Sequence, residues 1–199
     1  MLQKLTEVKT YHHGDLYQTL LNVGEQALAE MPVDQVTWRE IARRAGVSHA
    51  APKHHFASLG HLLAEIAARG FKRFMAELAE AADGAASQSP ATRLMAMGRA
   101  YFLFAQENPA AYQLMFGQRE PMVMTPRLID ASFESWDQMV SAVAAITGHT
   151  RAAAGAMHVW SSIHGLSLLR LAQRVPPDVP MHSMLEGQML MLIEGLKAE

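Results

Sequence analysis

The chain has 199 residues, of which 50% are hydrophobic and 18% charged, and its formal net charge is −2 at pH 7. This is an ordinary globular composition with enough apolar side chains for a sizeable core. The absence of cysteine excludes disulfides and thiolate sites, no signal peptide is visible, and every apolar run is far shorter than the roughly 18 residues of a membrane span. We therefore expect a cytoplasmic protein without a membrane segment.

The first two predicted elements are helices. Apolar residues recur at helical spacing over 15–31, with Asp15 as the predicted N-cap. A second helix is expected to start at Thr37, where the spacing to Glu40 fits a capping box in which both side chains bond to free backbone amides. Gly46 then permits the left-handed turn that ends this helix.

The rest of the chain also has helical periodicity, without strand-like alternation. Ser48 is predicted to cap a third helix that runs to about Phe56, and Ser58 a fourth that runs to about Glu80. A connector of small polar residues occupies 83–90. Further helices are expected over 91–107, 110–116, 127–146, 150–174 and 182–197. The prediction is an all-α chain of about nine helices.

The segment from Thr37 to Phe56 has the pattern of a helix-turn-helix. Its first helix is amphipathic, so that three small or branched residues can pack beneath the second helix, namely Ile41, Ala42 and Ala45. Val47 is expected to fill the angle between the two helices. In such a unit the second helix enters the major groove of DNA.

The charge distribution along the chain is asymmetric. Residues 1–75 hold nine Lys or Arg and seven Asp or Glu, a formal charge of +2, whereas residues 76–199 have a formal charge of −4. Six of the ten histidines also lie in the first 75 residues. The positive end of the chain is therefore the one that would meet a phosphate backbone.

These residues together resemble the DNA-binding domain of the TetR family of bacterial repressors. The matching positions are Thr37, Ile41, Ala42, Ala45, Gly46, Val47, Ser48 and the pair His55-Phe56, and residues 11–16 also resemble the start of many members. The resemblance implies two domains. Residues 1–60 would be a three-helix DNA-binding domain with the helix-turn-helix, and residues 61–199 a helical bundle for ligand binding and dimerisation.

The resemblance also implies roles for individual residues. Thr37, at the start of its helix, would contact a phosphate. Ser48, His49 and Ala50 would lie nearest the base edges, and Lys53, His54 and His55 would lie along the groove and the backbone. The chain departs from the family at Lys53, where a tyrosine is usual, and at Leu59, where a lysine is usual.

Two pairs of adjacent histidines, His12-His13 and His54-His55, raise the question of a metal site. Adjacent side chains point in different directions on a helix, and no carboxylate or cysteine lies at ligand spacing. We therefore expect neither a metal nor another cofactor.

The second half of the chain carries a further resemblance. Residues 160–166 resemble the Trp-His-Gly motif of one class of TetR C-terminal domain, and residues 108–116 a segment of the same class. Trp160 and His164 are four residues apart and share a helix face, which either lines a pocket or belongs to the core with internal hydrogen bonds. Gly165 is expected to allow close helix packing.

Aromatic residues and most of the chain's fourteen methionines lie in the predicted body, residues 61–199. Methionine suits both adaptable ligand surfaces and core filling. An apolar or aromatic effector is expected rather than a sugar or phosphate. The residues predicted to line its pocket are Tyr101, Tyr112, Phe116, Phe133, Trp136, Trp160 and His164.

The last predicted helix carries an apolar stripe formed by Leu185, Met189, Leu192, Ile193 and Leu196. The stripe fits an intramolecular core, a dimer interface or both at once. The resemblance implies a homodimer, which would favour a palindromic operator in double-stranded DNA. It also implies a repressor that a small-molecule effector releases from this operator.

Two other functions compete with this one. An enzyme would need catalytic residues, but the common nucleophile, phosphate-binding and metalloprotease motifs are missing from the sequence. We therefore expect no enzymatic activity. A dimeric DNA-binding protein without a small-molecule ligand is the stronger alternative, and a fully packed body would favour it.

Overall fold

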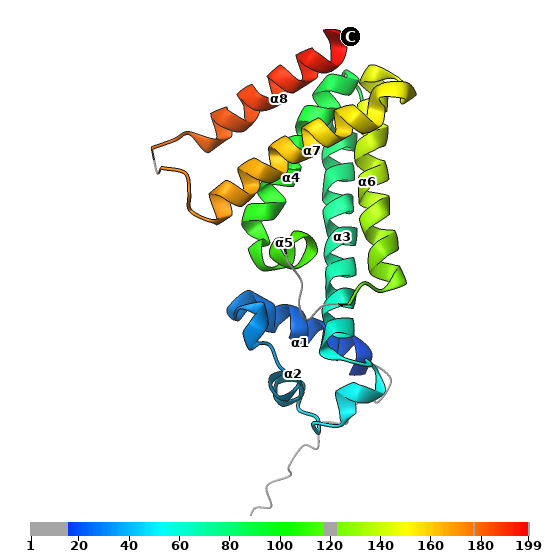
Figure 1. Cartoon of the computed structure of the whole chain (residues 1–199), viewed down its shortest axis with the longest axis vertical. Helices are drawn as coiled ribbons and strands as arrows, with labels where there is room; N and C mark the ends of the chain where they lie inside the picture. The colour runs from blue at the N-terminus through cyan, green and yellow to red at the C-terminus, as the bar shows by residue number, and fades with distance from the viewer. Residues whose placement is uncertain (1–15, 118–122, 177, 199) are drawn as a thin grey trace, which may run out of the picture.

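The computed structural model describes residues 16–117, 123–176 and 178–198 (Figure 1). Over these residues the secondary structure is helical, and no strand is found in them. The elements in chain order are α1 (Leu16–Glu30), η1 (Val33–Gln35), α2 (Trp38–Ala45), η2 (Ala51–His54), α3 (Leu59–Gly84), α4 (Pro90–Glu107), α5 (Pro109–Phe116), α6 (Pro126–Thr147), α7 (His149–Leu171) and α8 (Met181–Ala198), where η marks a 3₁₀-helix.

The predicted all-α fold is confirmed. Instead of about nine helices, the described residues form eight α-helices and two 3₁₀-helices. α3 continues to Gly84 and does not end near Glu80. α1 ends at Glu30, close to the end of the predicted range 15–31. The predicted N-cap at Asp15 lies outside the described residues.

A small helical unit at one end of the molecule carries the predicted helix-turn-helix (Figure 1). It consists of α1, η1, α2 and η2, and the first turns of α3 complete it. α3 then runs through the body beside α6 and packs on α4 and α5, while α7 and α8 cross the far end. The same helix therefore belongs to both parts of the chain.

The second helix of the helix-turn-helix differs from the prediction. An α-helix was expected from Ser48 to about Phe56, but the segment forms the short 3₁₀-helix η2, and no side chain caps it. Pro52 explains the difference, since it has no N–H to donate to the carbonyl of Ser48. The neighbouring amides of Ala51 and Lys53 bond three residues back, to Ser48 O at 3.1 Å and Ala50 O at 3.2 Å.

The start of α2 forms only half of the predicted capping box. Thr37 Oγ1 accepts a hydrogen bond from the backbone N–H of Glu40 at 3.2 Å, as predicted. The Glu40 carboxylate does not return the bond but accepts from Arg43 Nε at 2.9 Å and Arg44 Nε at 2.6 Å. These two arginines lower the pKa of Glu40 to about 2. The carboxylate is thus held by its own helix.

Gly46 ends α2 in the left-handed conformation, with φ 68° and ψ 29°, as the sequence predicts. We expect Gly46→Ala to lower the free energy of unfolding by about 1–2 kcal/mol, because a Cβ disfavours this conformation. Denaturant unfolding monitored by circular dichroism measures the change. Gly84→Ala is the control, since a Cβ at Gly84 would have no atom within 4 Å. An equal loss of stability in both variants would contradict the prediction.

One continuous core joins the helix-turn-helix unit to the body. Near its start, α3 packs closely on α1 at Gly24, where an added Cβ would lie 2.5 Å from Ile66 Cδ1. Further along, its buried Phe71, Phe74 and Leu78 face the body. α3 therefore connects both ends of the molecule through packed side chains. Among the described residues, no helix is both long enough and apolar enough to span a bilayer.

Candidate functional site

The helix-turn-helix presents a polar surface at the end of the molecule. All seven residues predicted to contact DNA are exposed, namely Thr37, Ser48, His49, Ala50, Lys53, His54 and His55. Pro52 and Phe56 from the same segment are buried. The segment therefore divides into an anchored side and an exposed side.

Aromatic stacking holds this segment in place. The ring of Phe56 stacks on Tyr17 of α1 with centroids 4.9 Å apart, and its centroid lies 6.5 Å from that of Trp38 of α2. Tyr17 is not among the residues that the sequence predicts for this site. Its place one residue after Leu16 on the predicted first helix gave no sign of a contact that comes from the tertiary fold.

The basic side chains of this unit differ in whether an acidic side chain already pairs with them. Arg44 is held by Glu30 at 2.8 Å and by Glu40, and Arg43 is also held by Glu40. Lys53, by contrast, is exposed and has no ion-pair partner in the described part of the chain. Of these three basic residues, Lys53 is the one whose charge is open to an external anion.

The described residues contain no cluster of three or more His, Cys, Asp or Glu side chains that could hold a metal ion. His54 and His55 are both exposed. The other pair, His12-His13, lies outside the described residues.

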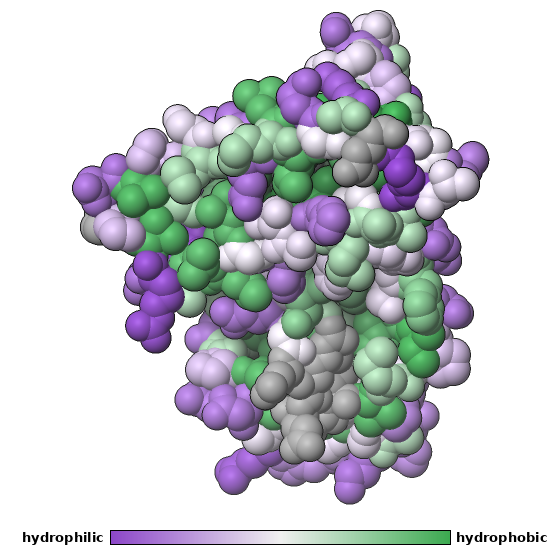
Figure 2. All heavy atoms as spheres, turned by 45° about the horizontal axis from the view of Figure 1, so that its top comes forward, coloured by the Kyte–Doolittle hydropathy of each residue, from purple (hydrophilic) through white to green (hydrophobic). Residues whose placement is uncertain are grey.

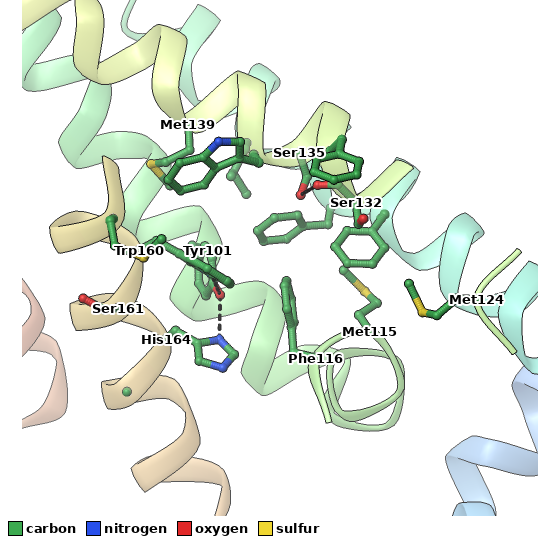
Figure 3. A pocket seen from close by; sticks show the side chains of 17 residues that line it. Tyr101, Met115, Phe116, Met124, Ser132, Ser135, Met139, Trp160, Ser161 and His164 are labelled. Atoms are coloured by element: carbon green, nitrogen blue, oxygen red, sulfur yellow. Dashed lines mark hydrogen bonds between the residues drawn. The ribbon is translucent and has the colours of Figure 1, made fainter. Parts of the chain in front are cut away.

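A cavity of about 710 Å³ lies in the body between α3, α4, α5, α6 and α7 (Figure 3). Six of the seven predicted pocket residues line it: Tyr101, Phe116, Phe133, Trp136, Trp160 and His164. Tyr112 is fully buried and lies outside the lining, although its hydroxyl contacts His164. Tyr112 therefore contacts the lining residue His164 but does not itself line the cavity, and its role in ligand binding stays a prediction.

A large part of the lining is not predicted by the sequence. The missed residues are Phe71, Phe74, Leu78, Met115, Met124, Ser132, Ser135, Met139, Met157, Ser161 and Gly165. The apolar spacing of Phe71, Phe74 and Leu78 marks one face of a helix, but such a stripe does not distinguish core from cavity. Gly165 does not serve close packing as expected, since a Cβ there would meet nothing within 4 Å.

A hydrogen-bonded cluster of four side chains lies at one side of the cavity, and three of them, Tyr101, Trp160 and His164, line it (Figure 3). Trp160 Nε1 donates to the hydroxyl of Tyr101 at 3.1 Å. His164 Nδ1 lies 2.9 Å from the Tyr101 hydroxyl and 2.6 Å from the Tyr112 hydroxyl, and the two hydroxyls are 3.1 Å apart. Trp160 and His164 thus combine the two alternatives, because they line the cavity and also have internal hydrogen-bond partners.

Burial sets the protonation of this cluster. It raises the pKa of Tyr101 and raises the pKa of Tyr112 to about 12, so both phenols keep their protons at neutral pH. Burial also lowers the pKa of His164, because it disfavours the imidazolium. The cluster is therefore uncharged at neutral pH.

The comparisons with known proteins agree with this architecture. Residues 20–66 match a family described as bacterial regulatory proteins of the tetR family, and residues 94–192 match a tetracyclin repressor-like C-terminal domain. No curated protein matches the sequence.

Solved structures share the fold over most of the chain. A protein of unknown function from Rhodococcus sp. RHA1 is 29% identical, with a TM-score of 0.82 over 95% of this chain and 99% of its own. A possible TetR family transcriptional regulator from Streptomyces coelicolor A3(2) is 18% identical, with a TM-score of 0.69 over 92% and 98%. A regulatory protein in the tetR family from Rhodococcus RHA1 is 18% identical, with a TM-score of 0.65 over 91% and 96%.

The two family matches lie on the two structural parts described above, the helix-turn-helix unit and the helical body with its cavity. On these grounds the chain belongs to the TetR family of DNA-binding bacterial regulatory proteins.

Proposed function

We propose that the protein is a cytoplasmic, ligand-responsive repressor. It binds a palindromic operator as a homodimer and leaves it when a small apolar or aromatic molecule enters the body. Residues 1–60 serve DNA binding, and residues 61–199 serve ligand binding and dimerisation. The observation that carries the proposal is the 710 Å³ cavity, one wall of which is the same helix, α3, that begins within the DNA-binding unit.

The exposed side of the helix-turn-helix supports the DNA-binding role. In this proposal, Ser48, His49 and Ala50 face the base edges, and the methyl group of Ala50 suits contact with thymine. Thr37 and the group Lys53, His54 and His55 lie along the phosphates. A lysine at position 53 meets a phosphate as a point charge, in place of the usual tyrosine hydroxyl.

A chain of contacts supports coupling between the cavity and this unit. Glu65 Oε2 on α3 accepts hydrogen bonds from Tyr17 of α1 and from Arg127 near the start of α6, each at 2.9 Å. Tyr17 in turn stacks on Phe56, at the end of the recognition segment. α6 also supplies cavity residues such as Trp136. A ligand that moves α6 or α3 can thereby shift the recognition segments, with a coupling free energy commonly of about 1–3 kcal/mol.

The exposed apolar side chains of the last two helices support dimerisation. Leu168 and Leu169 on α7 and Met184, Leu190 and Met191 on α8 are exposed, Met191 by 73%. Apolar groups gather where α7 and α8 lie, in the upper left of Figure 2. Part of the predicted apolar stripe of α8 belongs to the core of the chain itself, since Leu185, Met189 and Ile193 are buried. The outward side chains remain for a second copy, and a two-fold dimer would place two recognition segments about one DNA turn apart.

The cavity also distinguishes this proposal from the alternative without a small-molecule ligand. That alternative expects a fully packed body, whereas apolar and aromatic side chains surround an open volume here. The ligand-responsive function is therefore the one that the geometry favours.

Site selection from random double-stranded DNA tests the DNA-binding part of the proposal. The expected result is one enriched palindrome with half-sites about one helical turn apart, and an affinity that falls steeply with salt. Compounds that raise the melting temperature of the free protein are then added to the labelled operator complex. Release of DNA is expected, and a compound that binds the cavity without changing DNA affinity would contradict the switch.

Leu59 provides a gain-of-function prediction. It is the half-buried first residue of α3, at the position where the family usually has lysine. We expect Leu59→Lys to tighten operator binding at low salt and to steepen the slope of log K against log salt by about 2, since each of two phosphate contacts contributes about 0.9. Leu59→Gln, which removes the apolar side chain without adding charge, is the control. An unchanged slope in the lysine variant would contradict the prediction.

A further inference from the structure

Aromatic rings make up much of the cavity wall (Figure 3). They come from α3, α5, α6 and α7 and include Phe71, Phe74, Phe116, Trp136 and Trp160, so a ligand between them meets apolar surface on several sides. The volume of about 710 Å³ is more than four times that of a cavity of roughly 150 Å³, which holds one benzene molecule. The cavity therefore has room for a molecule of about two or three aromatic rings.

The described part of the wall carries no formal charge. Its described lining residues include no Asp, Glu, Lys or Arg, and burial lowers the pKa of His164, which favours the neutral imidazole. An ion that enters would lose its hydration without gaining a counter-charge. Residues 76–199, which supply most of the wall, have a formal charge of −4 and repel an approaching anion.

Four hydrogen-bond donors of the wall are engaged within the protein. Ser132, Ser135 and Ser161 donate to backbone carbonyls of their own helices, at 2.8, 3.0 and 3.1 Å. Trp160 Nε1 donates to the hydroxyl of Tyr101 at 3.1 Å. A carboxylate in an apolar site needs several donors in place of its water. It would have to break these bonds to obtain them, which adds to the cost of binding an anion.

We propose that the effector is an uncharged aromatic compound of about two or three rings, and that the cavity rejects anions and cations of the same shape. This inference rests on the proposed function, since it concerns the ligand of the same cavity. The faces of the aromatic rings attract a cation, but this attraction replaces only part of the hydration that the cation loses. The expected order of affinity is therefore the neutral compound first, then the cation, then the anion.

Three biphenyl derivatives test this order, because they have the same shape and differ in charge. At neutral pH, biphenyl-4-carboxamide is uncharged, biphenyl-4-carboxylate is an anion and biphenyl-4-carboxamidine is a cation. Equilibrium dialysis with the full-length protein gives the affinity of each compound. We expect the amide to bind at least about tenfold more tightly than either ion.

A charge placed in the wall should change this preference in a direction set by its sign. Ser135 is a half-buried lining residue of α6. We expect Ser135→Lys to raise the carboxylate-to-amide affinity ratio by about tenfold, which corresponds to one charge-assisted hydrogen bond. Ser135→Glu should instead raise the amidine-to-amide ratio. Because each ratio is compared between wild type and variant, differences in water solubility between the compounds cancel.

Ser141→Lys is the matched control for the added charge. Ser141 lies on the same helix and is exposed, but it is not among the lining residues of this cavity, so both ratios should stay unchanged. Met124→Lys is a second test variant, because Met124 lines the cavity and is 55% exposed, where a charge does not disturb the core. Circular dichroism verifies that each variant is folded, and Met124→Lys replaces Ser135→Lys if the latter is not.

Several results would overturn the assignment. These are an ion that binds the wild type as tightly as the amide, no binding of the amide up to its solubility, ratios unchanged in the folded lysine variants of the wall, and an equal change in Ser141→Lys. The operator-release assay on the same samples separates the two proposals. A preference for the amide without DNA release would contradict only the switch, whereas release by the carboxylate and not by the amide would contradict only the ligand assignment.

Discussion

Replacing Phe74 with alanine is expected to lower the free energy of unfolding by about 3–5 kcal/mol. Phe74 is 3% exposed and lies on α3 between the core and the cavity. Its ring makes edge contacts with Tyr101, Phe104 and Phe116, at centroid distances of 4.9, 5.2 and 6.0 Å. The variant loses the transfer free energy of the ring and these edge contacts together, and the cavity beside it grows.

Denaturant unfolding of the purified protein measures this loss. Phe133→Ala is the matched control, because Phe133 lines the same cavity but is 62% exposed. Its loss is expected to stay within about 0.5 kcal/mol, as for surface substitutions. A loss of no more than about 0.5 kcal/mol in both variants would mean that the Phe74 ring does not stabilise the core, and Phe74→Leu, which keeps most of the volume, would then also be neutral.

The local signals of the sequence predicted the helix-turn-helix well. Thr37 and Gly46 act within one or two turns of their own position, and the structure has both the predicted cap and the predicted left-handed turn. Pro52 is also a local signal, since it lacks a backbone donor, but the family-like pattern around it favoured an α-helix. Glu40 fits a capping box by spacing alone, yet two neighbouring arginines compete for its carboxylate.

The cavity was only partly predictable because it depends on how helices face one another. Trp160 and His164 share a helix face, and this pattern correctly placed them together. Tyr112 and Phe116 are both aromatic residues of the same predicted helix, and only the packing of α5 decides which of the two rings lines the cavity. The contribution of α3 was missed for the same reason, since an apolar stripe is identical in a packed core and in a cavity wall.

Operator binding is expected to weaken about thirtyfold on substitution of Lys53 with alanine. The estimate assumes about 1 kcal/mol for one phosphate contact in each of two half-sites. Lys53 is exposed beside the anchored Pro52 and has no ion-pair partner in the described residues, so its charge is available to a phosphate. Arg43 and Arg44 cannot replace it without giving up Glu40.

The salt dependence of operator binding tests whether Lys53 acts through phosphate contacts. Loss of two phosphate contacts should make the slope of log K against log salt shallower by about 2, equally for the operator and for random DNA. Lys72→Ala is the control, because Lys72 is exposed about 20 Å along α3 from its first residue, at the usual helical rise. Lys53→Arg should retain the slope. If the alanine variant kept the wild-type slope but lost its preference for the operator, Lys53 would instead contact bases. The recognition segment would then lie with Lys53 in the groove and not along the phosphates.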